Sequence, residues 1–73
     1  MNTPCGIEIK VGQQWKELDP RMYRTVTIVG IYPEMGRRPI VVRNNTNKRL
    51  SYNAVNRFNG KSGGYLFLPI NQG

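Results

Sequence analysis

A run of β-branched residues at positions 24–32 constrains the fold of this chain more than any other feature. The segment reads Arg-Thr-Val-Thr-Ile-Val-Gly-Ile-Tyr and, after Arg24, contains no strong helix former. β-Branched side chains lose rotamer freedom in a helix and pack well on a pleated surface. Val26 and Ile28 alternate with two threonines, which places the apolar pair on one face of a strand. The run therefore predicts the strongest strand of a β-sheet.

Shorter strand signals lie on both sides of this run, separated by Gly, Pro and Asn. Alternating or apolar stretches predict strands at 7–11, 13–18, 40–43, 49–52 and 65–68. A single helical turn is predicted over 53–58, with Asn53 as its N-cap. This order is typical of an all-β, small SH3-like barrel with five or six strands and one short helical turn before the last strand. We expect residues 7–70 to form this one domain, between a flexible N-terminus at 1–6 and a C-terminal tail at 71–73.

The residue types that are rare in the chain exclude several functions. It has 73 residues, no His and one Cys, so an intramolecular disulfide, a Cys/His metal cage and a His-dependent catalytic pair are ruled out. The four carboxylates are scattered along the first half, at Glu8, Glu17, Asp19 and Glu34. General acid–base catalysis needs tuned groups in one cleft. We therefore predict no catalytic residues, no metal, no cofactor and no enzyme activity.

The expected compartment is the cytoplasm. Cys5 is alone in the N-terminal segment and is assigned no partner, as fits a reducing environment. The first residues lack the basic and apolar regions of a signal peptide, and no apolar run is long enough to span a membrane. A chain of this length has a thin core, so self-association into a homo-oligomer is one route to stability.

Charge is distributed very unevenly along the chain. Residues 1–34 contain as many acidic as basic side chains, whereas residues 35–73 contain no acid, so the whole formal charge of +7 falls in the second half. Such an asymmetry predicts a positive field over one side of a small domain and attraction for polyanions. The alternative interpretation is that the basic residues only keep a small protein soluble.

The strands at 40–43 and 49–52 are expected to form a hairpin. If Val42, Leu50 and Tyr52 share the inner face, the connecting loop has an odd number of residues, because a shift of one residue reverses the faces. Arg43 then lies opposite Arg49, and both guanidiniums project outward. Two like charges directly opposite each other repel, so this arrangement favours an anion bound between them.

The aromatic and turn residues have both structural and functional interpretations. Trp15 and Phe58 are assigned to the core, while Tyr52 and Tyr65 are equally compatible with core and surface. Asp19 opens a turn with Pro20 at its second position, where the carboxylate accepts backbone N–H bonds and pairs with an arginine. Residues 61–64 are Gly-rich and basic but lack the spacing of a phosphate-binding loop, so a flexible connection is favoured.

A pattern of spaced residues resembles a group of small proteins encoded in phages and prophages. It runs through Gly12-x-x-Trp15-x-x-x-Asp19-x-Arg21, Arg24-x-Val26 with Val29, Arg57-Phe58 and Gly64-Tyr65. The resemblance covers about residues 9–68 and implies an SH3-like β-barrel of bacterial or phage origin. It implies nothing about catalysis. The longer loop at 32–39 departs from the pattern.

These observations favour a binding module that contacts nucleic-acid phosphates with little sequence specificity. Its predicted footprint consists of the basic residues of the second half and one stacking tyrosine: Arg37, Arg38, Arg43, Lys48, Arg49, Arg57, Lys61 and Tyr52. DNA and RNA are equally compatible with this footprint. The alternative partner is an acidic host protein, for which the chain would act as an inhibitor or adaptor.

Overall fold

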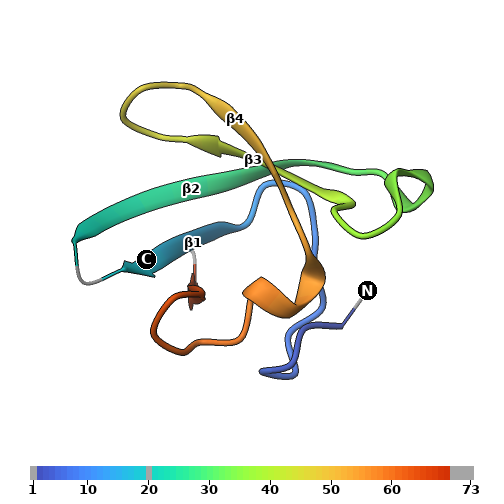
Figure 1. Ribbon diagram of the computed structural model, residues 1–73, viewed down its shortest axis with the longest axis horizontal. Helices are drawn as coiled ribbons and strands as arrows, with labels where there is room; N and C mark the ends of the chain where they lie inside the picture. The colour runs from blue at the N-terminus through green and yellow to red at the C-terminus, as the bar shows by residue number, and fades with distance from the viewer. Residues whose placement is uncertain (1, 20, 70–73) are drawn as a thin grey trace.

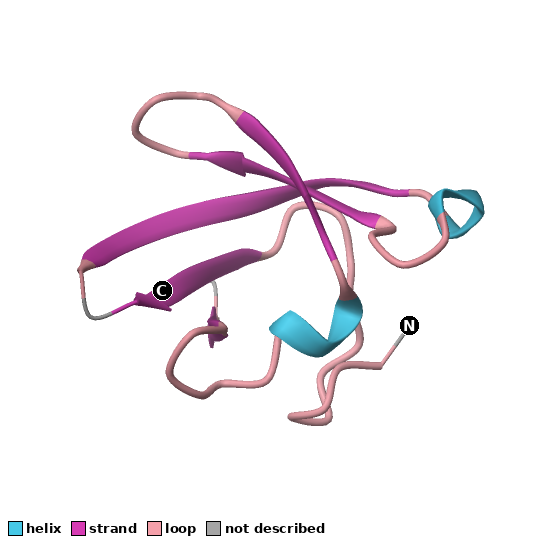
Figure 2. Ribbon diagram, viewed as in Figure 1, coloured by secondary structure: helices cyan, strands magenta, loops and turns pink. Residues whose placement is uncertain are grey.

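Five antiparallel strands form one twisted sheet in the computed structural model, which describes residues 2–19 and 21–69 (Figure 1). The strands are β1 (Gln14–Asp19), β2 (Met22–Ile31), β3 (Ile40–Asn44), β4 (Leu50–Asn53) and β5 (Tyr65–Leu68), in the sheet order β4-β3-β2-β1-β5. Two 3-10 turns, η1 (Pro33–Met35) and η2 (Val55–Arg57), are the helical segments of the described chain (Figure 2). The all-β prediction is confirmed. β4 and β5 form the two edges of the sheet and are not hydrogen-bonded to each other, so the sheet is open.

β2 is the central strand that its composition predicts. Val26 and Ile28 are buried, whereas Thr25 and Thr27 on the other face are half-buried. The pairing with β3 shifts between Ile28 and Gly30, which is a β-bulge. A bulge bends its strand and increases the local twist, and this one lies in the longest strand of the sheet.

An aromatic cluster fills the inner face of the sheet at one end. The Trp15 ring meets Phe58 at 5.0 Å and Phe67 at 5.2 Å between centroids, both edge to face. Phe58 stacks on Tyr65 at 4.9 Å. Trp15 and Phe58 are fully buried, so their assignment to the core is confirmed. The rest of the core consists of aliphatic side chains from the N-terminal segment, β2 and β3: Ile9, Val26, Ile28, Ile40 and Val42.

The strand predicted at 7–11 is wrong. The segment has a single bridge, between Asn2 and Glu8, and no strand. The Gln13 side chain takes the place of a neighbouring strand, because it donates to the Glu8 carbonyl at 2.8 Å and accepts from the Lys10 N–H at 3.0 Å. Ile9 still packs into the core, while Val11 is 62% exposed. The alternation of apolar and charged residues at 7–11 therefore predicts the burial of Ile9 but not the pairing of a strand.

The predicted pairing of the β3–β4 hairpin is also wrong. Arg43 lies opposite Leu50, not Arg49, and the Asn44 backbone N–H donates to the Arg49 carbonyl at 2.8 Å. The loop 45–48 thus has an even number of residues. Leu50 and Tyr52 are 60% and 51% exposed, so they do not share the inner face with Val42.

Polar side chains occupy the inner face of this hairpin instead. Asn44 and Asn53 are buried there, and Ser51 lies on the same face of β4 as Asn53 but is exposed. The prediction failed because it assumed that the inner face is apolar along its whole length. That assumption does not hold next to β4, which is an edge strand of the open sheet.

The predicted turns are present with small changes. The helical turn before the last strand is confirmed as η2, but Ala54 and not Asn53 precedes it, and no side chain caps it. The Asp19 carboxylate accepts the Arg21 N–H at 2.8 Å, as the turn signal predicts. Pro20 and the tail 71–73 lie outside the described residues.

The N-terminal segment and the loop at 61–64, both predicted to be flexible, form hydrogen bonds with the rest of the domain. Cys5 has a partner, since its thiol donates to the Phe58 carbonyl at 3.2 Å. The loop at 61–64 is hydrogen-bonded to β1 through Gly63 and Gly64, which bond Leu18 at 2.7 and 2.8 Å.

Replacing Trp15 with Ala is expected to lower the free energy of unfolding by about 3–5 kcal/mol, because it removes the ring on which two other rings pack. Small domains have only about 5–15 kcal/mol in total, so the variant should be largely unfolded at moderate temperature. Urea denaturation measures the change. Tyr52→Ala is the matched control for an exposed aromatic, and a Trp15→Ala melting temperature as close to the parent's as the control's would contradict the core assignment.

Candidate functional site

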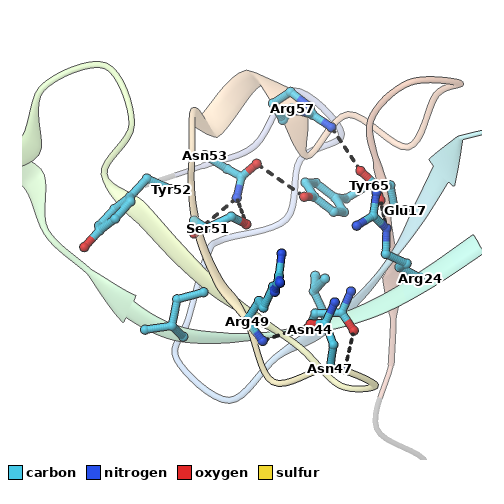
Figure 3. Close-up of a pocket in the computed structure, with 12 residues that line it drawn as sticks. Glu17, Arg24, Asn44, Asn47, Arg49, Ser51, Tyr52, Asn53, Arg57 and Tyr65 are labelled. Carbon is cyan, nitrogen blue, oxygen red and sulfur yellow. Dashed lines mark hydrogen bonds and ion pairs between the residues drawn. The ribbon is translucent and has the colours of Figure 1, made fainter. Parts of the chain in front are cut away.

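A polar cleft opens on the inner face of the sheet, beside the aromatic cluster (Figure 3). It has a volume of about 420 Å³ and lies between β4, the adjoining parts of β1 and β2, η2 and β5. Its lining residues are Glu17, Arg24, Val26, Asn44, Asn47, Arg49, Leu50, Ser51, Tyr52, Asn53, Arg57 and Tyr65. The cleft exists because the edge strands β4 and β5 do not pair and the side chains between them are polar.

Glu17 is the electrostatic centre of the cleft. Sheet register places it directly opposite Arg24 on β2 and opposite Tyr65 on β5. Its carboxylate lies 3.0 Å from the Arg24 Nε and 3.5 Å from an Arg57 terminal nitrogen, and its side chain is only 14% exposed. One carboxylate thus neutralises half of the charge of two guanidiniums.

The two arginines are incompletely satisfied by Glu17. The Nε atoms of Arg24 and Arg57 are buried and donate no hydrogen bond. Arg24 Nε is close to a carboxylate oxygen, so this contact is an ion pair in which the N–H is not aimed at the acceptor. Arg57 also lies over the Tyr65 ring, 5.2 Å from its centroid. Buried donors without an acceptor cost free energy, so they favour a site that accepts an anion.

A network of amides and hydroxyls forms the opposite wall. The Tyr65 hydroxyl donates to the Asn53 side-chain oxygen at 3.3 Å, and the Asn53 amide donates to the Ser51 hydroxyl at 3.2 Å. The Asn44 oxygen accepts the backbone N–H groups of Thr46 and Asn47 at 2.8 and 3.2 Å. These bonds fix the wall of the cleft to the β3–β4 turn.

Burial raises the pKa of Tyr65 above its ordinary value of 10.0, and the nearby Glu17 carboxylate raises it further. Arg57 and Arg24 act in the opposite direction and do not overcome these effects. The buried phenol therefore stays protonated as a donor to Asn53 throughout the neutral range.

The structure brings five of the eight predicted site residues to one side of the domain. Arg49 and Arg57 line the cleft, and the Arg49 side chain points into it (Figure 3). Arg38 lines a second hollow of about 260 Å³ together with Tyr52 and Arg57. Arg37 lines a third hollow of about 490 Å³.

The three hollows adjoin one another along the connection from β4 to η2. The first and second share Tyr52, Asn53 and Arg57. The second and third share Ala54 and Asn56. We call this surface the arginine groove and define it by its guanidiniums, Arg24, Arg49, Arg57, Arg38 and Arg37. Glu17 is the single carboxylate among the residues that line it.

Three predicted site residues do not line the groove. Arg43 lies on the outer face of β3, with its neighbours Val42 and Asn44 turned inward. Lys48 is in the hairpin loop, where its ammonium donates to the Asn45 carbonyl at 2.9 Å. Lys61 belongs to the loop before β5. Tyr52 borders the groove, but its ring points away from the cleft (Figure 3).

Sequence reasoning missed Glu17 and Arg24, which come from the electrically neutral half of the chain. A signal for the pair exists, because the turn at Asp19 makes residues 17 and 24 cross-strand partners in a tight hairpin. The inward-facing asparagines had no comparable signal. Asn is common in turns, and Asn53 is predicted from the sequence as a helix N-cap.

Comparison with protein-family models, with curated proteins and with solved structures finds no match for this chain. Within residues 2–19 and 21–69, no three acidic, Cys or His side chains lie close enough together to hold a metal ion. In the same part of the chain, no helix has the length and apolar character needed to cross a bilayer.

Replacing Glu17 with Gln is expected to lower the free energy of unfolding by about 1–2 kcal/mol. The change leaves two partly buried guanidiniums close together without their anion, so it costs more than losing an exposed pair and less than losing a fully buried one. Glu8→Gln is the matched control, because Glu8 pairs with Lys10 at 3.8 Å on the exposed surface. Equal losses for the two variants in chemical denaturation would contradict the central position of Glu17.

Alkaline pH should reveal the buried phenol of Tyr65. A folded-state pKa above the unfolded value of 10.0 means that the folded chain holds this proton more tightly. Its contribution to stability is complete below pH 10.0 and is lost as the pH rises through the folded pKa. Tyr65→Phe should therefore show a shallower alkaline loss of stability than the parent, by denaturation across this range. Tyr52→Phe controls for the substitution, and an unchanged decline in Tyr65→Phe would refute the assignment.

Proposed function

We propose that this chain is a binding module that contacts nucleic-acid phosphates along the arginine groove, with little sequence specificity. The observation that carries the proposal is the line of five guanidiniums through three adjoining hollows, with one carboxylate among them. Arginine presents a planar fork of donors that fits phosphate oxygens. Contacts to phosphates carry affinity without reading sequence.

The excess of positive charge around Glu17 supports an anionic ligand. Arg24 and Arg57 share the single carboxylate of Glu17, and Arg49 makes no ion pair with a described residue. A phosphate oxygen supplies acceptors that Glu17 alone does not. Glu17 in turn holds Arg24 and Arg57 in place before the ligand arrives, which reduces the entropy that binding costs.

The proposal includes a fold and a setting. We interpret the open five-stranded sheet as an SH3-like barrel that is incompletely closed between β4 and β5, in a protein of the phage or prophage type that acts in the cytoplasm. The groove then occupies the gap where a closed barrel would continue its sheet. The chain acts in this proposal by binding and not by catalysis.

Two arginines of the same hairpin provide a matched test. Arg49 points into the cleft and Arg43 lies on the outer face of β3, so replacing each with Gln removes the same charge from opposite sides of the sheet. Each phosphate contact contributes about 0.7–0.9 to the slope of log K against log salt. Arg49→Gln should flatten the slope by about this amount, and Arg43→Gln should leave it nearly unchanged.

Fluorescence anisotropy with short DNA and RNA, over a salt series from about 50 to 200 mM, measures these slopes. An equal loss in both variants would mean that the groove is not the binding surface. Affinities weaker than about 100 µM for both polymers at low salt fall below non-specific binding and would reject the proposal. An acidic protein partner would then be the remaining candidate, and a pull-down that survives nuclease treatment would identify it.

A further inference from the structure

The cleft reaches from the surface down to the buried layer of the domain. Its floor consists of side chains that are almost fully buried, namely Val26, Asn44, Asn53 and Tyr65. Exposed residues of the hairpin, including Arg49 and Ser51, form its rim. A volume of about 420 Å³ falls within the size range of small-ligand sites. Contact with a phosphate on the outside of a duplex requires no hollow, whereas a hollow of this volume can enclose an unstacked base.

The polar groups that remain available in this cleft are mainly hydrogen-bond donors. The side-chain oxygens of Asn44 and Asn47 already accept backbone N–H groups, so each asparagine has its amide NH₂ left. The Ser51 hydroxyl oxygen accepts from Asn53, which leaves its own O–H. Both oxygens of the Glu17 carboxylate already pair with arginines, one with Arg24 and the other with Arg57. Donors of this kind complement the carbonyl oxygens of a nucleobase.

The groove has the shape that suits a single strand. Its guanidiniums line hollows between elements, and the helical segments of the described chain are two three-residue turns, too short to serve as a recognition helix in a major groove. A positively charged groove that follows the backbone is the usual site for single-stranded nucleic acid. Guanidinium planes stack on unpaired bases, and Arg24, Arg49 and Arg57 supply three such planes at the cleft.

We propose that the arginine groove binds a single strand and that the cleft takes one unstacked base from it. The base carbonyl oxygens accept from the amides of Asn44 and Asn47, and flanking phosphates contact Arg49 and Arg38. This inference rests on the proposed function, because it specifies the form of nucleic acid that the same groove binds.

Two adjacent asparagines allow a matched pair of variants. Asn44→Asp keeps an oxygen for the Thr46 and Asn47 N–H groups, so the turn is preserved, but it removes the amide donors from the cleft. Asn45→Asp adds the same charge one residue further along, where the side-chain oxygen accepts from Thr27 at 2.7 Å and does not line the cleft. The pair thus separates loss of the donor from gain of a negative charge.

The experiment measures anisotropy with three probes of about ten nucleotides: oligothymidylate, an abasic strand of equal charge and the duplex of the first with its complement. Thymine is chosen because it has two carbonyl oxygens. A base stacked in a protein site contributes about 1–3 kcal/mol. The parent should therefore bind oligothymidylate about tenfold tighter than the abasic strand and tighter than the duplex. Asn44→Asp should reduce the preference over the abasic strand to about threefold or less, while Asn45→Asp should retain it.

The outcomes distinguish the inference from the function on which it rests. Equal binding of single strand and duplex, or of oligothymidylate and the abasic strand, would overturn the inference and leave phosphate binding intact. A preference that Asn44→Asp and Asn45→Asp reduce equally would overturn the assignment of the base to the cleft. Failure of the parent to bind any of the three probes at low salt would overturn both proposals.

Discussion

The ion pairs of Glu17 hold together the elements on which the candidate site depends. Its carboxylate joins β1 to Arg24 on β2 and to Arg57 on η2, a segment that is distant in the sequence. The chain has four acidic residues, and this is the one that lies among the arginines of the groove. Without it, guanidiniums from different elements would repel each other at close range. With it, they are positioned together and retain a net positive charge.

The division of the inner face explains why a domain this small has both a core and a cleft. At one end, Trp15 and the rings around it occupy the space between the curved sheet and η2. At the other end, Asn44 and Asn53 replace apolar side chains, and their side-chain oxygens accept hydrogen bonds without filling the space. Tyr65 connects the two ends, because its ring stacks on Phe58 and its hydroxyl donates a hydrogen bond to Asn53. The polar wall is therefore anchored directly on the core.

Local patterns in the sequence predicted much of the fold. β2 and β5 follow from β-branched and aromatic runs, and the burial of Trp15 follows from its size in a thin core. The β3–β4 pairing could not be predicted in this way, because the rule that apolar residues face inward assigns Leu50 and Tyr52 to the wrong side. The same rule failed at 7–11, where the side chain of Gln13 and not another strand satisfies the backbone.

The candidate site was predictable only in part, for an electrostatic reason. The charge imbalance identified Arg37, Arg38, Arg49 and Arg57, since they belong to the half without acids. It could not identify Arg24, which is balanced by acids nearby in sequence and whose partner is set by strand register. Likewise, it did not separate Arg49 from Arg43, because a charge count carries no information about the face of a strand.

The most direct test of the account is a nuclear magnetic resonance titration of the protein with oligothymidylate, in which backbone amides and arginine Nε–H signals are followed together. The account predicts that the largest shifts fall on Arg24, Arg49, Arg57 and the amide of Asn44, while Arg43 on the outer face barely moves. The Nε–H signals of Arg24 and Arg57 should shift as the charge of a phosphate approaches their guanidiniums. Shifts centred on Arg43 and the outer face of the sheet, with the groove unaffected, would contradict it.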